Sequence, residues 1–238
     1  MSLVEMWWRR ASGTTPALGS SALYPIALVG LAGVLLAWPL VRMAVTVCHE
    51  AGHAVAATLT GRSLRGIRLH SDTSGVTTTR GRPAGAGMVI TLLAGYPAAS
   101  LVGLGAAAVA GAGHAVGVLW LLVGLLALML LQVRNLYGAL VVLVLGAVLA
   151  IATWYAPTRV LGWLAYGLAW LLLVAAPRPV LELALSGRHA SAGSDAAQLA
   201  RLTHVPRTVW IVLWLAGTVG ALVLGTVWML PGFLPAIG

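Results

Sequence analysis

Long apolar stretches, separated by short polar connections, run along almost the whole chain. A transmembrane helix needs about 20 apolar residues in succession, and seven stretches come close to that length: 21–38, 40–60, 86–111, 115–132, 136–155, 159–176 and 208–230. Only 8% of the 238 residues are charged, whereas soluble domains have about 25%. The sequence therefore predicts an all-α polytopic membrane protein with about six to seven transmembrane helices, in one membrane-embedded domain over residues 1–238.

Two of these stretches contain helix-breaking residues. Trp38-Pro39 interrupts residues 21–60, because proline removes a backbone donor and disfavours a helical residue before it. We therefore expect two spans here, or one helix broken at Pro39. Gly95-Tyr96-Pro97 predicts a kink in the third stretch. Beyond this kink, a small residue recurs every fourth position and should let another helix approach closely: Ala99, Gly103, Ala107 and Gly111.

Three segments are more polar than the rest. Residues 1–20 contain tryptophan and arginine, which suit an interfacial N-terminal tail. Residues 61–85 alternate at 67–70, continue through the turn-forming residues 71–75 and become β-branched at 76–79, which predicts a small hairpin-like insertion. Residues 177–207 form a loop before the last apolar stretch.

The fourteen basic residues are all arginines and are unevenly distributed. If seven spans alternate sides, the N-terminus and residues 61–85, 133–135 and 177–207 share one face, which carries twelve arginines. The other face carries only Arg42 and Arg159. The positive-inside rule then makes the arginine-rich face, with the N-terminus, cytoplasmic. It also explains the basic charge without a nucleic-acid partner, and the arginine-only, Ala- and Gly-rich composition favours a bacterial inner membrane.

The second stretch contains His49-Glu50-Ala51-Gly52-His53, two histidines and a carboxylate in an apolar helix. Residues four apart lie on the same helical face, so both imidazoles can bind one metal ion, for which Zn²⁺ is the usual choice. Glu50 lies beside them and could take a proton from a metal-bound water. A charged residue at membrane depth costs roughly 2.5–3.5 kcal/mol unless it pairs or binds something. The pattern therefore predicts a metal site rather than polar residues that are simply buried in the core.

A catalytic zinc usually has three protein ligands and an open fourth position. His53 is predicted close to the cytoplasmic end of its helix, so a third ligand can come from the polar segments at 61–85 or 177–207, or from a nearby helix end. The candidates are His70, Asp72, His189, Asp195 and His204. We favour Asp195, which opens a short predicted helix before the last stretch, although aspartate there would also serve as an N-terminal helix cap.

These motifs together resemble a known family. The His49–His53 motif inside an apolar stretch is followed by Thr60-Gly61-Arg62, Ser74-Gly75-Val76-Thr77-Thr78, Ala94-Gly95-Tyr96 and Ser194-Asp195-Ala196-Ala197-Gln198-Leu199. This series is similar to the site-2-protease-like intramembrane zinc metalloproteases, and most similar to a compact bacterial branch without a PDZ domain. Better-known members place a glycine after the aspartate, where this chain has Ala196.

The resemblance implies one Zn²⁺ per chain, with His49, His53 and Asp195 as ligands and Glu50 as the base that activates water. It also implies cleavage of a partner protein's transmembrane helix within the lipid bilayer. A β-structured segment would hold the unwound substrate, and the matching residues here are Val76, Thr77 and Thr78. Such a strand could pair with the extended substrate by strand addition.

Two other readings remain at this level. A non-catalytic membrane zinc-binding scaffold, or a degenerate protease, could keep the histidines without cutting a substrate. The intact Glu50 argues against both, because a purely structural metal site does not need it. A transporter would show more polar residues within its spans and repeated broken helices, and the apolar stretches here offer little beyond Gln132 and Asn135 near one boundary.

Overall fold

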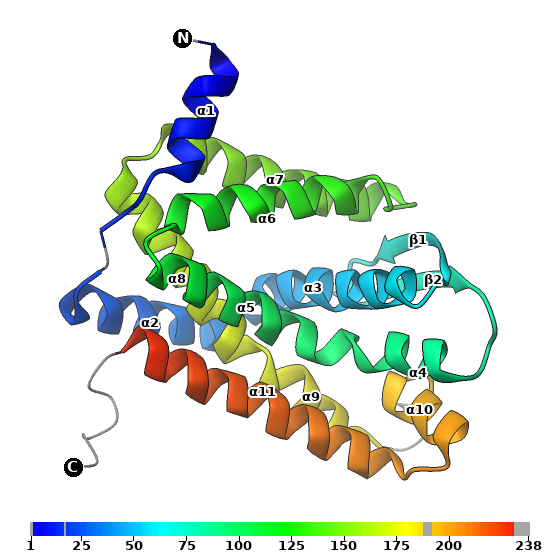
Figure 1. Ribbon diagram of the computed structural model, residues 1–238. Helices are drawn as coiled ribbons and strands as arrows, with labels where there is room; N and C mark the ends of the chain where they lie inside the picture. Colours follow the sequence, from blue (N-terminus) through cyan, green and yellow to red (C-terminus); the bar gives the residue numbers. More distant parts are fainter. Residues whose placement is uncertain (1, 17, 188–191, 231–238) are drawn as a thin grey trace, which may run out of the picture.

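The computed structural model describes residues 2–16, 18–187 and 192–230, which form eleven α-helices and two β-strands (Figure 1). In chain order these are α1 (Leu3–Ser12), α2 (Ser20–Leu36), α3 (Trp38–Leu59), β1 (Ser63–Leu69), β2 (Gly75–Arg80), α4 (Ala86–Leu93), α5 (Gly95–Gly111), α6 (Ala115–Leu130), α7 (Leu136–Tyr155), α8 (Thr158–Ala175), α9 (Pro177–Leu185), α10 (Asp195–Thr203) and α11 (Arg207–Met229). The predicted class, a helical membrane protein with a small β-hairpin, is confirmed.

Fewer helices are long enough to span a membrane than the sequence predicts. Among the described residues, three segments are long and apolar enough by themselves: Leu136–Tyr155, Thr158–Leu185 and Arg207–Met229. Two bent pairs, α2 with α3 and α4 with α5, bring the number to five if each pair makes one span, and α6 is a shorter apolar helix. The predicted six to seven differs mainly because α2 and α3 were counted as separate spans.

The corner between α2 and α3 has a bend of 100°. Pro39 lies in the first turn of α3, where proline is tolerated, so the break predicted here is confirmed. Arg178 from α9 stabilises the corner: its Nη1 donates to the Val34 carbonyl oxygen at 2.7 Å, and its guanidinium lies 4.1 Å from the centre of the Trp38 ring. The carbonyl exposed by the break therefore has a donor, which a helix end inside an apolar bundle requires.

The core is centred on α8, which packs against α2, α5 and α11. Leu161, Ala165, Ala169 and Leu173 of α8 are fully buried. The predicted small-residue face of α5 is part of this contact, since a Cβ at Gly103 would lie 2.9 Å from Leu173 and 3.2 Å from the Ala169 carbonyl oxygen. The exception is Gly111, around which a Cβ would find open space.

The bundle has two distinct ends (Figure 1). At one end, Arg10 of α1 donates to the carbonyl oxygens of Thr153 and Ala156, and Thr15 bonds to Gly113. The hairpin lies at the other end, where Ile67 of β1 forms a β-bridge with Val133 in the turn between α6 and α7. The prediction that the N-terminal segment shares a face with residues 61–85 is therefore wrong. Helices α6 and α7 run between the two ends, with α1 at the start of α6 and the end of α7, and the hairpin at the turn that joins them.

A second placement derived from the seven-span count is also wrong. Arg42 and the segment that begins at residue 177 were predicted on opposite faces. In the structure, Arg42 Nη2 and Arg178 Nε lie 3.8 and 3.5 Å from the two carboxylate oxygens of Glu182. Both arginines therefore lie at one level, next to the α2–α3 corner.

The hairpin pairs β1 with β2 in antiparallel register, with Ile67 opposite Thr77 and Leu69 opposite Gly75. Leu64, Ile67 and Leu69 point inward and pack with residues of α3, α6 and α7. The turn is tied to α3 as well, because the Thr46 hydroxyl donates to the Thr73 carbonyl oxygen at 2.8 Å. The hairpin is thus fixed along α3, the helix that carries both histidines.

Candidate metal centre

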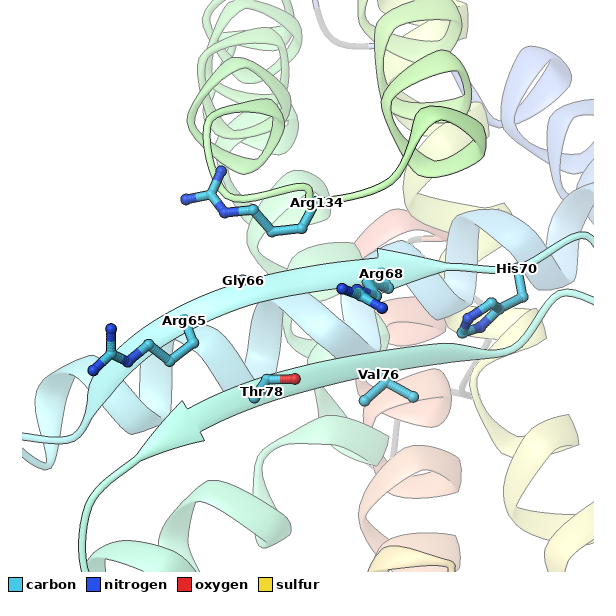
Figure 2. A pocket seen from close by; sticks show the side chains of 7 residues that line it. All are labelled: Arg65, Gly66, Arg68, His70, Val76, Thr78 and Arg134. Carbon is cyan, nitrogen blue, oxygen red and sulfur yellow. The ribbon is translucent and has the colours of Figure 1, made fainter.

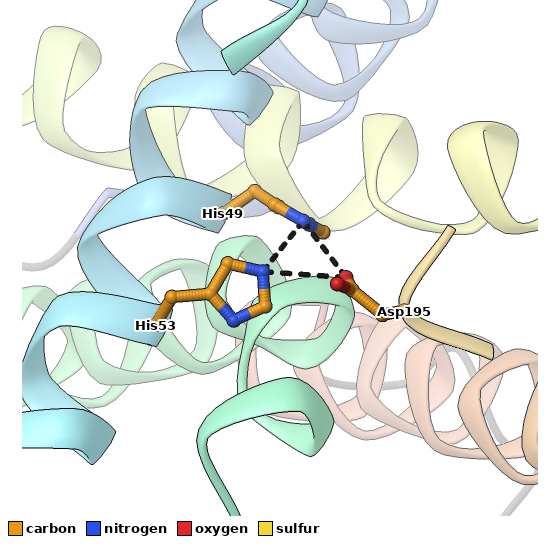
Figure 3. Close-up of side chains that lie close together, drawn as sticks. All are labelled: His49, His53 and Asp195. Atoms are coloured by element: carbon orange, nitrogen blue, oxygen red, sulfur yellow. Dashed lines mark hydrogen bonds and ion pairs between the residues drawn. The ribbon is translucent and has the colours of Figure 1, made fainter. Parts of the chain in front are cut away.

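Helix α3 presents His49 and His53 on one face, as their four-residue spacing predicts. Their Nε2 atoms lie 3.0 Å apart, and the two rings meet edge to face (Figure 3). Glu50, the next residue along the chain, is buried with only 3% of its surface exposed. The sequence motif has therefore folded into a compact cluster within the bundle.

Helix α10 brings Asp195 to the two histidines. Ser194 caps this helix by accepting a hydrogen bond from the Ala197 backbone, so Asp195 starts its first turn. Ala196 and Leu199 are fully buried in a cluster that includes Leu92 of α4 and Trp214 of α11, which anchors α10 beside α3 and α4. The capping role was the alternative considered for Asp195, but Ser194 performs it.

The three side chains have the geometry of a tetrahedral metal site. Asp195 Oδ2 lies 3.2 Å from Nε2 of both His49 and His53, which completes a triangle with the 3.0 Å contact between the imidazoles (Figure 3). Ligands bound tetrahedrally to Zn²⁺ at about 2.0–2.1 Å are roughly 3.3–3.4 Å from one another. Two imidazole nitrogens and a carboxylate oxygen are also donors that zinc accepts, so these residues fit the ion.

His53 is held in the orientation that a ligand needs. Its Nδ1 lies 2.7 Å from the Thr91 carbonyl oxygen near the end of α4. When Nδ1–H donates this hydrogen bond, Nε2 is unprotonated and its lone pair points toward His49 and Asp195, as metal coordination requires. The orientation of His53 therefore depends on the position of the Thr91 carbonyl oxygen near the end of α4.

The break between α4 and α5 leaves room for both imidazoles. A Cβ at Gly95 would lie 2.6 Å from Cε1 of His49 and from Nε2 of His53, so a side chain at this position would displace the ligands. The next residue, Tyr96, contacts the His49 ring edge to face and lies against Trp214. The kink predicted at Gly95-Tyr96-Pro97 is present, with a bend of 58° between the helices.

Glu50 is linked to the hairpin rather than to another helix. The Thr77 hydroxyl of β2 donates to Glu50 Oε2 at 2.6 Å. Gly75 of the same strand lies against this side chain, since a Cβ there would approach Glu50 Cγ to 2.6 Å. The glycine and threonine of the hairpin therefore fix the carboxylate beside the histidine cluster.

The surroundings favour a charged Asp195. Burial opposes ionisation of this carboxylate. In the metal-free protein His49 and His53 donate to it when their Nε2 atoms carry protons, which outweighs burial and holds the pKa of Asp195 well below its ordinary value. The start of α10 adds the positive end of a helix dipole. His49 keeps 23% of its side chain exposed, so the cluster reaches the surface of the protein on that side.

The other candidate ligands lie elsewhere. His70 and Asp72 are in the hairpin turn, where both side chains contact Ser74. His204 ends α10 in a left-handed conformation, and His189 lies outside the described residues. Among the residues that the structure describes, His49, His53 and Asp195 form the group that could hold a metal ion.

Sequence reasoning missed the supporting residues. Thr91 is an ordinary residue of an apolar stretch, and nothing in its local pattern marks its carbonyl oxygen as a partner of His53. Thr77 was predicted to contact substrate, and its hydrogen bond to Glu50 depends on strand register, which the sequence left open. Gly95 and Tyr96 belonged to the motifs of the resemblance and to a predicted kink, but their contact with the histidines was not predicted.

Fold and site together define a helical membrane protein with a candidate metal centre inside its bundle. The chain belongs to the Peptidase M50B-like family, whose family model matches residues 21–225. This match confirms the resemblance to the site-2-protease-like family and places the chain in a family of membrane peptidases. No curated protein and no solved structure gives a significant match to the chain.

Proposed function

We propose that this protein is a zinc-dependent intramembrane endopeptidase that cuts peptide bonds in or near the transmembrane helices of other membrane proteins. The observation that carries the proposal is the nearly equilateral triangle of His49, His53 and Asp195, with the Glu50 carboxylate beside it. Peptidases of this family are zinc-dependent in general. A purely structural metal site would have no use for a fixed carboxylate next to it.

The residues have distinct roles in this proposal. His49, His53 and Asp195 would hold one Zn²⁺ ion, which when bound polarises a carbonyl and makes water more acidic. Glu50 accepts the proton of the attacking water and delivers it to the leaving amine. The Thr77 hydroxyl donates to Glu50 Oε2 and holds the carboxylate in place.

A substrate helix must unwind before it is cut, and the free edge of β2 can hold the unwound segment. Ile67 uses both its backbone N–H and its C=O to bond residues 132 and 134, so its backbone faces away from β2. Its antiparallel partner Thr77 then faces away from β1, toward the open edge. Of the three predicted contact residues, Thr77 offers this backbone edge, whereas the backbones of Val76 and Thr78 pair with β1.

If the substrate adds as a strand at this edge, the effect of removing a substrate N–H on the cleavage rate should alternate with a period of two residues. The substrate is a synthetic transmembrane helix in which one backbone amide at a time is N-methylated and so loses its N–H. The cleavage rate should decrease when the methylated amide is one that pairs with β2, and stay unchanged at the positions between. The reason is that only every second amide of a strand faces its neighbour. The measurement is cleavage rate against methylation position, with an alanine scan of the same peptide as the control for side-chain effects. A loss that does not alternate would contradict strand addition.

We also propose that the hairpin end faces the cytoplasm of a bacterial cell. The hairpin, the α6–α7 turn, α10 and the start of α11 lie at that end (Figure 1). These elements and the residues next to them carry Arg62, Arg65, Arg68, Arg80, Arg82, Arg134, Arg201 and Arg207. At the other end, α1 and the start of α8 carry Arg9, Arg10 and Arg159. The positive-inside rule still favours the hairpin end as cytoplasmic. The N-terminus is then on the opposite side. Labelling of single cysteines placed at residues 14 and 72 in a Cys48→Ala background, in intact and opened cells, tests this orientation.

Detergent-purified protein tests the function directly. We expect about one zinc per chain by elemental analysis, and cleavage of a reporter transmembrane helix that stops on chelation and returns when Zn²⁺ is added, because the three ligands fit that ion. Zinc bound without cleavage of any helix in lipid would favour a non-catalytic scaffold. Absence of bound metal would contradict the proposal.

A further inference from the structure

The outer face of the hairpin, turned away from α3, carries a basic pocket of about 360 Å³. It is lined by three arginines and a histidine, Arg65, Arg68, Arg134 and His70, together with Val76 and Thr78 (Figure 2). The candidate metal centre uses none of the four basic residues. Their concentration on one small surface therefore calls for a role of its own.

Two backbone irregularities build this pocket. The register shifts between Leu64 and Gly66, which leaves Arg65 as an extra residue in a β-bulge. Leu64 and Ile67 both point into the core, so the two residues between them both line the outer face. Gly66 provides space for the third arginine, because a Cβ there would lie 2.3 Å from Arg134 Cγ. The hairpin thus gathers arginines from both β1 and the α6–α7 turn.

The arginines of the pocket lack acidic partners. None of the three forms an ion pair with a carboxylate in the described part of the chain, and Arg65 and Arg68 have no side-chain hydrogen bond there. Arg134 uses Nη1 on the carbonyl oxygens of Leu131 and Val133 and keeps its other donors. The acidic group near His70 is Asp72, whose Oδ1 already accepts from Ser74 N–H and hydroxyl. The pocket therefore presents unneutralised positive charge.

The pocket lies where apolar helix ends meet polar surface. Leu131, at the end of α6, and Leu136, at the start of α7, are 67% and 78% exposed and flank Arg134 in the chain. In a membrane protein such leucines contact acyl chains, so Arg134 is at the level of the headgroups. Val76, half exposed at 51%, adds an apolar surface inside the pocket.

We propose that this pocket binds the phosphate of an anionic phospholipid headgroup, with the acyl chains against the ends of α6 and α7. Arginine forks match phosphate oxygens in pairs, and clustered arginines attract anionic lipid. An acidic peptide could bind to the arginines but would leave the neighbouring exposed leucines without a partner. A lipid can contact both, which is why we favour it. This site is separate from the peptidase chemistry and does not depend on it.

Equilibrium binding of tail-labelled phosphatidylglycerol to the full-length protein in neutral detergent tests the proposal. Each basic residue near an anionic lipid increases the binding affinity roughly fivefold. The R65Q/R68Q variant should therefore bind phosphatidylglycerol roughly 25-fold more weakly than the wild type. The matched control is R9Q/R159Q, which removes two exposed arginines at the other end of the bundle and should change binding less than about twofold. Both changed pairs are exposed, and thermal unfolding of each variant checks its folding.

Competition identifies the ligand class. Unlabelled phosphatidylglycerol should displace the probe, while phosphatidylcholine should not. Equal weakening in both double variants, or none in either, would overturn the proposal. Displacement by millimolar inorganic phosphate as effective as by the lipid would make this a free-anion site. Stronger displacement by an acidic peptide would make it a docking site for acidic protein segments.

Discussion

Glu50→Gln should keep its zinc and lose peptide cleavage. The carboxamide has nearly the shape of the carboxylate and can still accept the Thr77 hydrogen bond, while the ligands are untouched. It cannot accept a proton from water at neutral pH, and general acid–base catalysis of this kind contributes about 10²- to 10⁴-fold to the rate. Metal content by elemental analysis and cleavage of a reporter helix, measured on the same preparation, separate the two effects.

The matched control for this variant is Glu5→Gln. Glu5 is an exposed carboxylate in the first turn of α1, at the end of the bundle away from the hairpin. Its loss should weaken only the N-terminal cap of α1 and leave cleavage unchanged. If Glu50→Gln cut the reporter at the wild-type rate, Glu50 would not be the base and the proposed chemistry would fail.

Asp195→Ala should lose bound zinc, and cleavage with it. The carboxylate supplies one corner of the triangle, at 3.2 Å from each imidazole nitrogen. Losing a side chain that only orients a ligand already costs roughly 10- to 100-fold in metal affinity, and losing the ligand itself should cost more. Titration of the metal-free protein with Zn²⁺ against a chelating indicator measures the change.

Asp72→Ala is the control for Asp195→Ala. Asp72 was a candidate ligand in the sequence, but in the structure it lies exposed in the hairpin turn and bonds to Ser74. Its loss should leave zinc affinity within about twofold of the wild type, because it lies outside the cluster. Retained zinc affinity in Asp195→Ala, or loss in Asp72→Ala, would show that the third ligand is assigned wrongly.

The two histidines and Glu50 could be located from the sequence because the motif is local. Spacing within one helix fixes which side chains share a face, and no knowledge of the rest of the fold is needed. Asp195 was different. Spacing left it the favoured one of five candidates, and the resemblance strengthened that choice. Its position depends on how α10 packs under α4 and α11, which is a long-range contact that no local pattern encodes.

The topology of the chain likewise depends on long-range structure that local sequence patterns do not encode. Hydropathy located the apolar segments and the break near Pro39, and the alternating pattern located the hairpin, whose strands are Ser63–Leu69 and Gly75–Arg80. Hydropathy could not show whether the segments on either side of the break cross once or twice, because this depends on the angle at the corner, which is 100°. The seven-span count therefore placed the N-terminal segment at the wrong end of the bundle.

The origin of the three ligands in the chain has a consequence for biosynthesis. His49 and His53 lie in the first quarter of the chain, and Asp195 follows about 140 positions later. Because a ribosome makes the N-terminal part first, Glu50 and both histidines enter the membrane long before their third partner exists. The nascent chain therefore carries an incomplete centre while its neighbours are being inserted. In the proposed peptidase, the metal centre can therefore form only after Asp195 has been made, and cleavage cannot begin before then.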